Sequence, residues 1–121
     1  MATLRFWYKI LDKAPPKPIP RTLPLSPLDA KDGFIHLSVA SQIPITAGKF
    51  FSASSSLWVL QIQREKLVGR FDFPPPYGEV CPHLHDSEEG LGSNNVVDVI
   101  EMRRAATEEW KDVPAMAKLE N

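Results

Sequence analysis

The sequence predicts an α+β domain with a small β-sheet, antiparallel or mixed, and one or two flanking helices. Segments rich in aromatic and β-branched residues recur along the chain, and one further segment has the spacing of a short helix. Clusters of proline, glycine and serine separate these segments. The length of 121 residues suits one hydrophobic core and leaves no room for two ordinary domains.

The N-terminal third is expected to contain one strand, one extended connection and one helical turn. Leu4 to Leu11 is rich in aromatic and β-favouring residues, which predicts a strand buried on at least one face. Residues 14–27 contain six prolines, which remove backbone donors and fix φ, so an extended connection is expected there. Ser26 can cap a helical turn that ends at the turn signal Asp32-Gly33.

A short strand is expected directly after this turn. Strand alternation places Phe34, His36 and Ser38 on one face and Ile35 and Leu37 on the other. The two aliphatic side chains are predicted to point into the core. The first three are therefore candidates for a ligand-facing surface.

The rest of the chain is expected to contain one more helix and three more strands in a single domain, residues 1–103. The expected elements are a helix at 41–51, a central strand at 57–63, a strand at 68–73, a long polar loop and candidate lid at 77–95, a final strand at 95–102, and a polar tail at 104–121, helical in part or frayed.

Composition disfavours several classes of function. The net charge is −1 and the basic residues are scattered, so the charged stripe typical of nucleic-acid binding is missing from the sequence. No apolar run approaches the roughly 18 residues of a membrane span, and the first residues lack signal-peptide features, so a cytoplasmic protein is expected. A single cysteine, Cys81, excludes an internal disulfide. Glycine-rich phosphate loops, dinucleotide fingerprints and hydrolase elbows are also missing from the sequence.

The candidate chemistry lies with the three histidines. Cys81, His83 and His85 occupy alternate positions, so in an extended segment their side chains point to the same side. Thiolate and imidazole are zinc ligands, which makes a metal site one interpretation and ordinary polar packing the other. Only His36 is left to complete such a site. The nearby carboxylates, Asp72, Glu79 and Glu65, belong to no diagnostic motif.

The order and spacing of several motifs resemble the family catalogued as domain of unknown function 952. They are Asp32-Gly-Phe-Ile-His-Leu-Ser38, then Gln42, Ala47 and Phe50-Phe51, then Leu57-Trp-Val-Leu-Gln-Ile62, and Pro82-His83-Leu84. The match covers most of residues 4–102. That family is similar to the ADP-ribosyltransferase superfamily, whose members have a small split β-sheet with flanking helices and bind NAD in the cleft.

The resemblance implies roles for individual residues. His36 would hydrogen-bond the ribose of NAD with Ser38 beside it, Phe51 would line the nicotinamide or base pocket, and His83 would face the same cleft. In a catalytic site His36 and His83 would position the substrate, and Asp72, or alternatively Glu79, would supply the carboxylate. Family members commonly have Trp-Glu where this chain has Phe71-Asp72, Tyr-Gly where it has His85-Asp86, and a helix in place of the proline-rich segment.

The predicted function is binding of NAD or an ADP-ribose-type nucleotide in a cleft around His36 and His83, with ADP-ribosyl transfer as its enzymatic form. Two alternatives remain open. One is a metal-binding protein that uses Cys81, His83 and His85. The other is a protein-interaction module that presents the proline-rich segment at 14–27.

Overall fold

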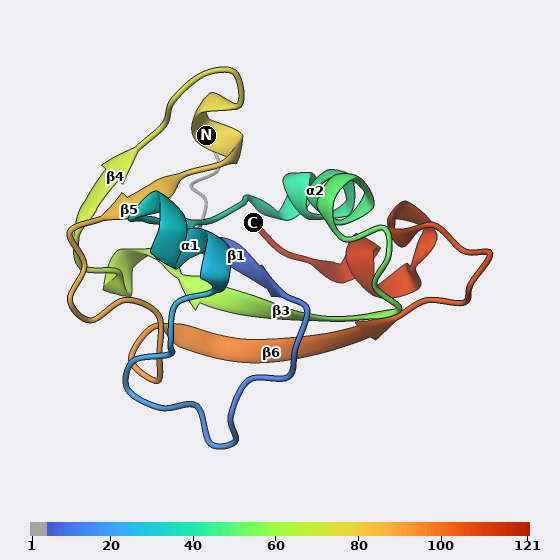
Figure 1. The fold of residues 1–121 in the computed structure, drawn as a ribbon, viewed down its shortest axis with the longest axis horizontal. Coiled ribbons are helices and arrows are strands. Elements are labelled where there is room, and N and C mark those ends of the chain that lie inside the picture. The colour runs from blue at the N-terminus through green and yellow to red at the C-terminus, as the bar shows by residue number, and fades with distance from the viewer. Residues whose placement is uncertain (1–4) are drawn as a thin grey trace.

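Two three-stranded antiparallel sheets frame the protein in a computed structural model, which describes residues 5–121 (Figure 1). A bridge between Tyr8 and Ser38, with N···O distances of 2.7 and 2.9 Å, joins the two sheets. The prediction of a small α+β domain is confirmed. Sheet A has the order β1 (Phe6–Leu11), β3 (Ser56–Gln63), β6 (Val96–Arg103), and sheet B the order β2 (Ile35–His36), β5 (His83–His85), β4 (Arg70–Asp72).

The three strands of sheet A lie where the sequence predicts them, and β3 is central as expected. Leu4, at the start of the expected first strand, lies outside the described residues. Leu57 and Val59 point into one core, whereas Leu60 and Ile62 point into another. β3 is therefore covered on both faces, which explains its almost continuous apolar sequence.

Both predicted helices are present. In α1 (Pro27–Asp32), the Ser26 hydroxyl accepts a hydrogen bond from the Asp29 backbone N–H at 3.2 Å, and Gly33 ends the helix with φ of 79°. A 3₁₀ turn at Ala40–Gln42 leads into α2 (Ile43–Phe50), which confirms the helix expected at 41–51. Pro44 is tolerated because it lies in the first turn of α2.

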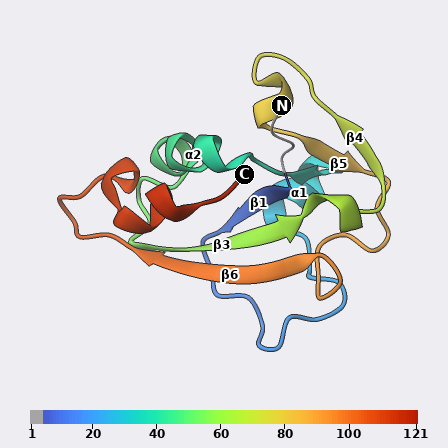
Figure 2. The same cartoon turned by 180° about the vertical axis from the view of Figure 1, so that it is seen from behind.

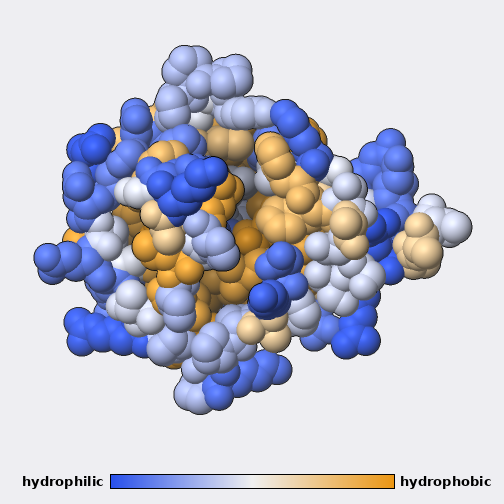
Figure 3. Space-filling view, viewed as in Figure 1, coloured by the Kyte–Doolittle hydropathy of each residue, from blue (hydrophilic) through white to orange (hydrophobic). Residues whose placement is uncertain are grey.

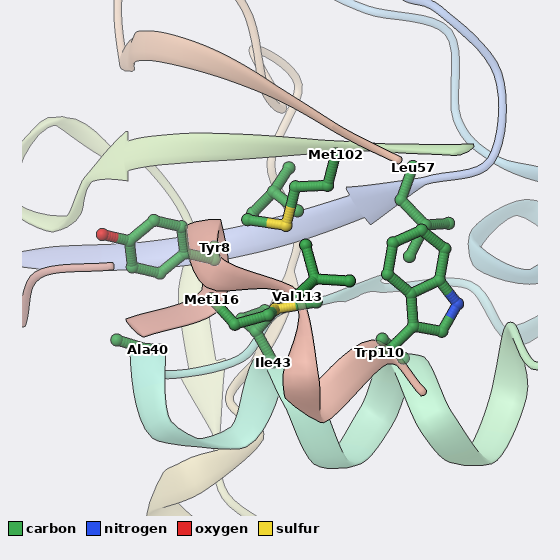
Figure 4. Packing of buried hydrophobic residues seen from close by; sticks show 10 residues of the cluster. Tyr8, Ala40, Ile43, Leu57, Met102, Trp110, Val113 and Met116 are labelled. Atoms are coloured by element: carbon green, nitrogen blue, oxygen red, sulfur yellow. The ribbon is translucent and has the colours of Figure 1, made fainter. Parts of the chain in front are cut away.

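The C-terminal segment is helical in part, as expected, but it packs into the core instead of forming a polar tail. Trp110, Val113 and Met116 are buried with α2 against sheet A, and the Trp110 indole N–H donates to the Phe51 carbonyl at 2.9 Å (Figure 4). Figures 1 and 2 both place this segment beside α2 over the same face of the sheet. The buried residues recur every third position, which suits the two 3₁₀ helices at Trp110–Asp112 and Pro114–Lys118.

The proline-rich segment is an extended connection up to α1, as predicted, and it is held in place by the turn at 90–95. Backbone hydrogen bonds join Leu23 to Leu91 at 2.7 Å and Ser93 to Pro20 at 2.9 Å. At Gly92 a Cβ atom would overlap the Arg21 carbonyl, so only glycine permits this approach.

The expected polar loop at 77–95 needs correction, because it contains β5 and ends in an ordered turn. The fully buried Asn95 side chain donates to the Gly90 carbonyl at 2.9 Å and accepts from the Gly92 N–H at 3.0 Å. None of the helices within residues 5–121 is both long and apolar enough to cross a membrane.

Candidate functional site: the histidine face of sheet B

All three histidines of the chain lie on one face of sheet B. The register places His36 of β2 opposite His83 of β5, and His83 opposite Asp72 of β4. His85 lies in the next row of this face, opposite Arg70. Residues paired across strands share a face, so these side chains form one surface, the histidine face.

The opposite face of sheet B belongs to the core. Ile35 and Leu84, which pair across β2 and β5, have exposed fractions of 5% and 1%. Phe71 of β4 packs against the same cluster. The prediction that Ile35 and Leu37 point into the core is confirmed, and this burial fixes which face presents the histidines.

Phe34 lies among the three imidazoles. Its ring centroid is 4.2 Å from that of His83, with an interplanar angle of 20°, and 4.6 and 4.8 Å from those of His36 and His85. The His36 and His83 centroids are 5.2 Å apart. The structure therefore brings together two segments that are far apart in the sequence and gives them a shared aromatic neighbour.

Two carboxylates of α1 hold the His36 ring. Nδ1 lies 2.7 Å from Oδ1 of Asp29, and Nε2 lies 3.1 Å from Oδ2 of Asp32. The backbone N–H of His36 also donates to Asp29 Oδ1, at 3.2 Å. Both contacts are hydrogen bonds only when the ring is an imidazolium, because a neutral imidazole has a single N–H donor.

Behind His36 lies a buried ion pair. The Lys9 Nζ atom is 2.6 Å from Asp29 Oδ2 and donates to the His36 carbonyl at 3.1 Å. Burial alone would raise the pKa of Asp29, but the hydrogen bond from His36 and the charge of Lys9 outweigh it and lower that pKa. Burial lowers the pKa of Lys9, and Asp29 opposes that shift.

The sequence predicts no functional role for Lys9 or Asp29. It does indicate that Lys9 is buried, because Lys9 alternates with Trp7 and Leu11, which both point into the core next to sheet B. A lysine on the buried face of a strand needs a carboxylate partner.

The surroundings of His83 favour its neutral form. Burial lowers its pKa, and the nearby His36 and His85 lower it further, whereas Asp72 and Asp32 oppose the shift. A neutral imidazole has one donor and one acceptor nitrogen. Asp72 is exposed, and its Oδ1 accepts from the Phe73 backbone N–H at 3.0 Å.

Other predicted site residues lie elsewhere. Phe51 ends α2 and packs against the core on the other side of sheet A, so the structure does not bring it to the histidine face. Ser38 is 7% exposed and its backbone pairs with Tyr8. Its side chain hydrogen-bonds with Cys81, yet burial dominates and raises the pKa of the Cys81 thiol. A protonated thiol is a poor nucleophile and a poor zinc ligand.

No group of three or more His, Cys, Asp or Glu side chains in the described part of the chain is arranged to hold a metal ion. The metal interpretation of Cys81, His83 and His85 therefore gains no support. Within residues 5–121, the buried Nε2 atom of His85 has no hydrogen-bond partner. A polar atom in this state is a candidate for contact with a ligand.

The fold and the site define a small α+β protein whose histidines are gathered on one face of a three-stranded sheet. The chain belongs to the family described as "Protein of unknown function (DUF952)", whose model matches residues 17–99. Family membership is thus confirmed, and the matched range includes His36, Asp72 and His83. A search of curated proteins finds no match.

Solved structures support the fold. Two crystal structures of protein CC0527 from Caulobacter crescentus, one of a double mutant, resemble this chain with a TM-score of 0.62 and 24% identity. Each comparison covers 86% of this chain and 91% of that one. At this identity the likeness concerns the fold alone.

Proposed function

We propose that the histidine face binds NAD or a related ADP-ribose compound. The observation that carries the proposal is the row of His36, His83 and Asp72 across the three strands of sheet B. Within this row Asp29 and Asp32 hold the ring of His36, and the pKa of His83 is lowered. The likeness to ADP-ribosyltransferases, which family membership alone does not establish, is part of the proposal.

The groups present suit the parts of such a ligand. A neutral His83 matches the paired donor and acceptor character of a ribose hydroxyl. Phe34 offers an aromatic ring to a base or nicotinamide, in the role first expected of Phe51. Arg70, in the row of His85, pairs with Asp86 at 3.3 Å, but both side chains are exposed, so a diphosphate can compete with Asp86 for the guanidinium.

An enzymatic form of this function is ADP-ribosyl transfer. The bond between ribose C1′ and the nicotinamide nitrogen breaks, a bond from C1′ to an acceptor oxygen forms, and the proton of the acceptor hydroxyl passes to His83. Nicotinamide leaves with the electron pair of the broken bond. The lowered pKa of His83 supports its role as base, and Asp72 opposite it would stabilise the imidazolium.

The proposal is tested by titrating the protein with NAD and ADP-ribose while its amide NMR signals are recorded. Saturable shifts are expected at residues 34–38 and 83–85. Phe34→Ala should weaken binding about tenfold, since stacking of one base contributes about 1–3 kcal/mol. Phe50→Ala is the matched control, because Phe50 is 66% exposed on α2, away from sheet B.

Two results would count against the proposal. Binding is refuted if neither ligand produces a saturable response at the histidine face. Transfer alone is refuted if nucleotide binds but no nicotinamide is released with water or with other hydroxyl acceptors.

A further inference from the structure

A concavity lies where the proline-rich connection meets β1 and β3, apart from the histidine face. Its volume is about 330 Å³, and its walls include the aliphatic side chains of Leu11, Leu23, Leu60 and Leu91. Figure 3 shows hydrophobic residues around a hollow near the middle of the face that carries α1 and β1 in Figure 1. The volume lies at the small end of the range for ligand pockets, about 300–1,000 Å³.

Lys9 and Asp29 are buried charged residues in the wall of this pocket, whereas Asp12 and Lys13, which also line it, are exposed. An ammonium group has three donors, and within the part of the chain that the structure describes, Lys9 Nζ reaches two acceptors, Asp29 Oδ2 and the His36 carbonyl. The Lys9 side chain is only 9% exposed, so solvent has little access to the third donor. A buried donor without a partner is costly, and a ligand acceptor would satisfy it.

The charges at this end of the pocket already balance. Lys9 is paired with Asp29 at 2.6 Å, and Asp29 also faces His36. A ligand carboxylate at Lys9 would lose hydration beside the buried Asp29 carboxylate and would be repelled by it. A neutral carbonyl offers the missing acceptor without adding a charge.

We infer that this pocket binds a small, mainly apolar molecule that carries one neutral acceptor, such as an amide or ketone carbonyl, directed at Lys9. The inference does not depend on nucleotide binding at the histidine face. The two sites are nevertheless linked, because one oxygen of Asp29 holds Lys9 and the other holds His36. Occupation of the pocket should therefore change the NMR signals of the His36 ring.

The test uses two probes of the same shape, cyclohexanecarboxamide and cyclohexanecarboxylate, titrated into the full chain without nucleotide and followed by methyl and amide NMR. The amide has about nine non-hydrogen atoms, so binding in the millimolar range is expected. Saturable shifts should appear at Leu23 and Leu91, with a coupled shift at His36. The carboxylate should bind at least about tenfold more weakly because of its charge beside Asp29.

A matched pair of variants controls for the site. Leu25 and Leu28 have exposed fractions of 53% and 54%, but only Leu25 lines the pocket. Leu25→Asp should weaken amide binding about fivefold or more through lost apolar contact and added charge, while Leu28→Asp should leave it unchanged. The inference is overturned if the amide gives no saturable shift at the pocket, if the carboxylate binds equally well, or if the two variants behave alike.

Discussion

Replacing Asp29 with asparagine should destabilise the protein by about 3 kcal/mol, because the Lys9 charge would remain buried without its partner. The side-chain exposed fractions of Lys9 and Asp29 are 9% and 2%, so water cannot replace the lost carboxylate. The two carboxylate oxygens of Asp29 accept from Lys9 Nζ and from the His36 backbone N–H. The side-chain amide of asparagine has only one oxygen, so in either orientation its nitrogen would face one of these two donors.

Thermal and urea unfolding followed by circular dichroism measure this change. A loss of about 3 kcal/mol corresponds to a fall in Tm of roughly 10 °C in a chain of this length. Glu101→Gln is the control, because the pair between Glu101 and Arg103 has a similar distance of 2.7 Å but side chains that are 42% and 77% exposed. That substitution should cost less than about 1 kcal/mol. Equal effects of the two substitutions would refute the argument from burial.

The pH dependence gives a second readout of Asp29→Asn. Because the folded state lowers the pKa of Asp29 below its ordinary 3.8, the folded state binds this proton less readily than the unfolded state. The stabilisation is therefore present above pH 3.8 and is lost as the pH falls through the folded pKa. The variant should show a flatter loss of stability with acid, whereas an unchanged acid dependence would contradict the assigned shift.

Three further predictions concern the histidine face, the backbone at two glycines and the packing of the C-terminal segment. In NMR titrations His83 should protonate at a lower pH than a free histidine. The substitution His85→Gln should raise the pKa of His83, because it removes the electrostatic effect of His85 that lowers this pKa. An unaltered pKa of His83 would contradict the proposed coupling. Gly69→Ala should cost more than about 2 kcal/mol, because φ is 147° and the new Cβ would lie 2.6 Å from the His85 carbonyl oxygen, whereas Gly48→Ala in α2 meets open space and should stabilise by about 0.5–1 kcal/mol. If urea unfolding ranks these two variants the other way, the backbone argument is wrong. Trp110→Ala should cost about 3–5 kcal/mol, since the side chain is 1% exposed; a change below about 1 kcal/mol would mean that the C-terminal segment is peripheral.

The features that the sequence predicts well depend on local physics. The Ser26 cap and the Gly33 turn involve neighbours in the chain, so their residue types alone indicate α1. Alternation correctly placed Ile35 and Leu37 in the core, because strand period is also local. The apolar run of β3 predicted a central strand, because a short run of this kind is typical of a strand covered on both faces.

The features that the sequence could not supply depend on register and distant pairing. His36 and His83 are opposite each other only because β2 and β5 pair in one particular register. Asp29 meets Lys9 because α1 packs against β2, and no local pattern specifies that approach. The burial of Trp110 was missed because its apolar partners recur every third residue in a segment with many charges.

A crystal structure of the protein with ADP-ribose tests most directly our proposal that the histidine face binds a nucleotide. We predict a ribose hydroxyl within hydrogen-bond distance of a ring nitrogen of His83, with the adenine or the second ribose near Phe34. A structure in which ADP-ribose, present at saturating concentration, lies away from sheet B or does not bind would contradict the claim.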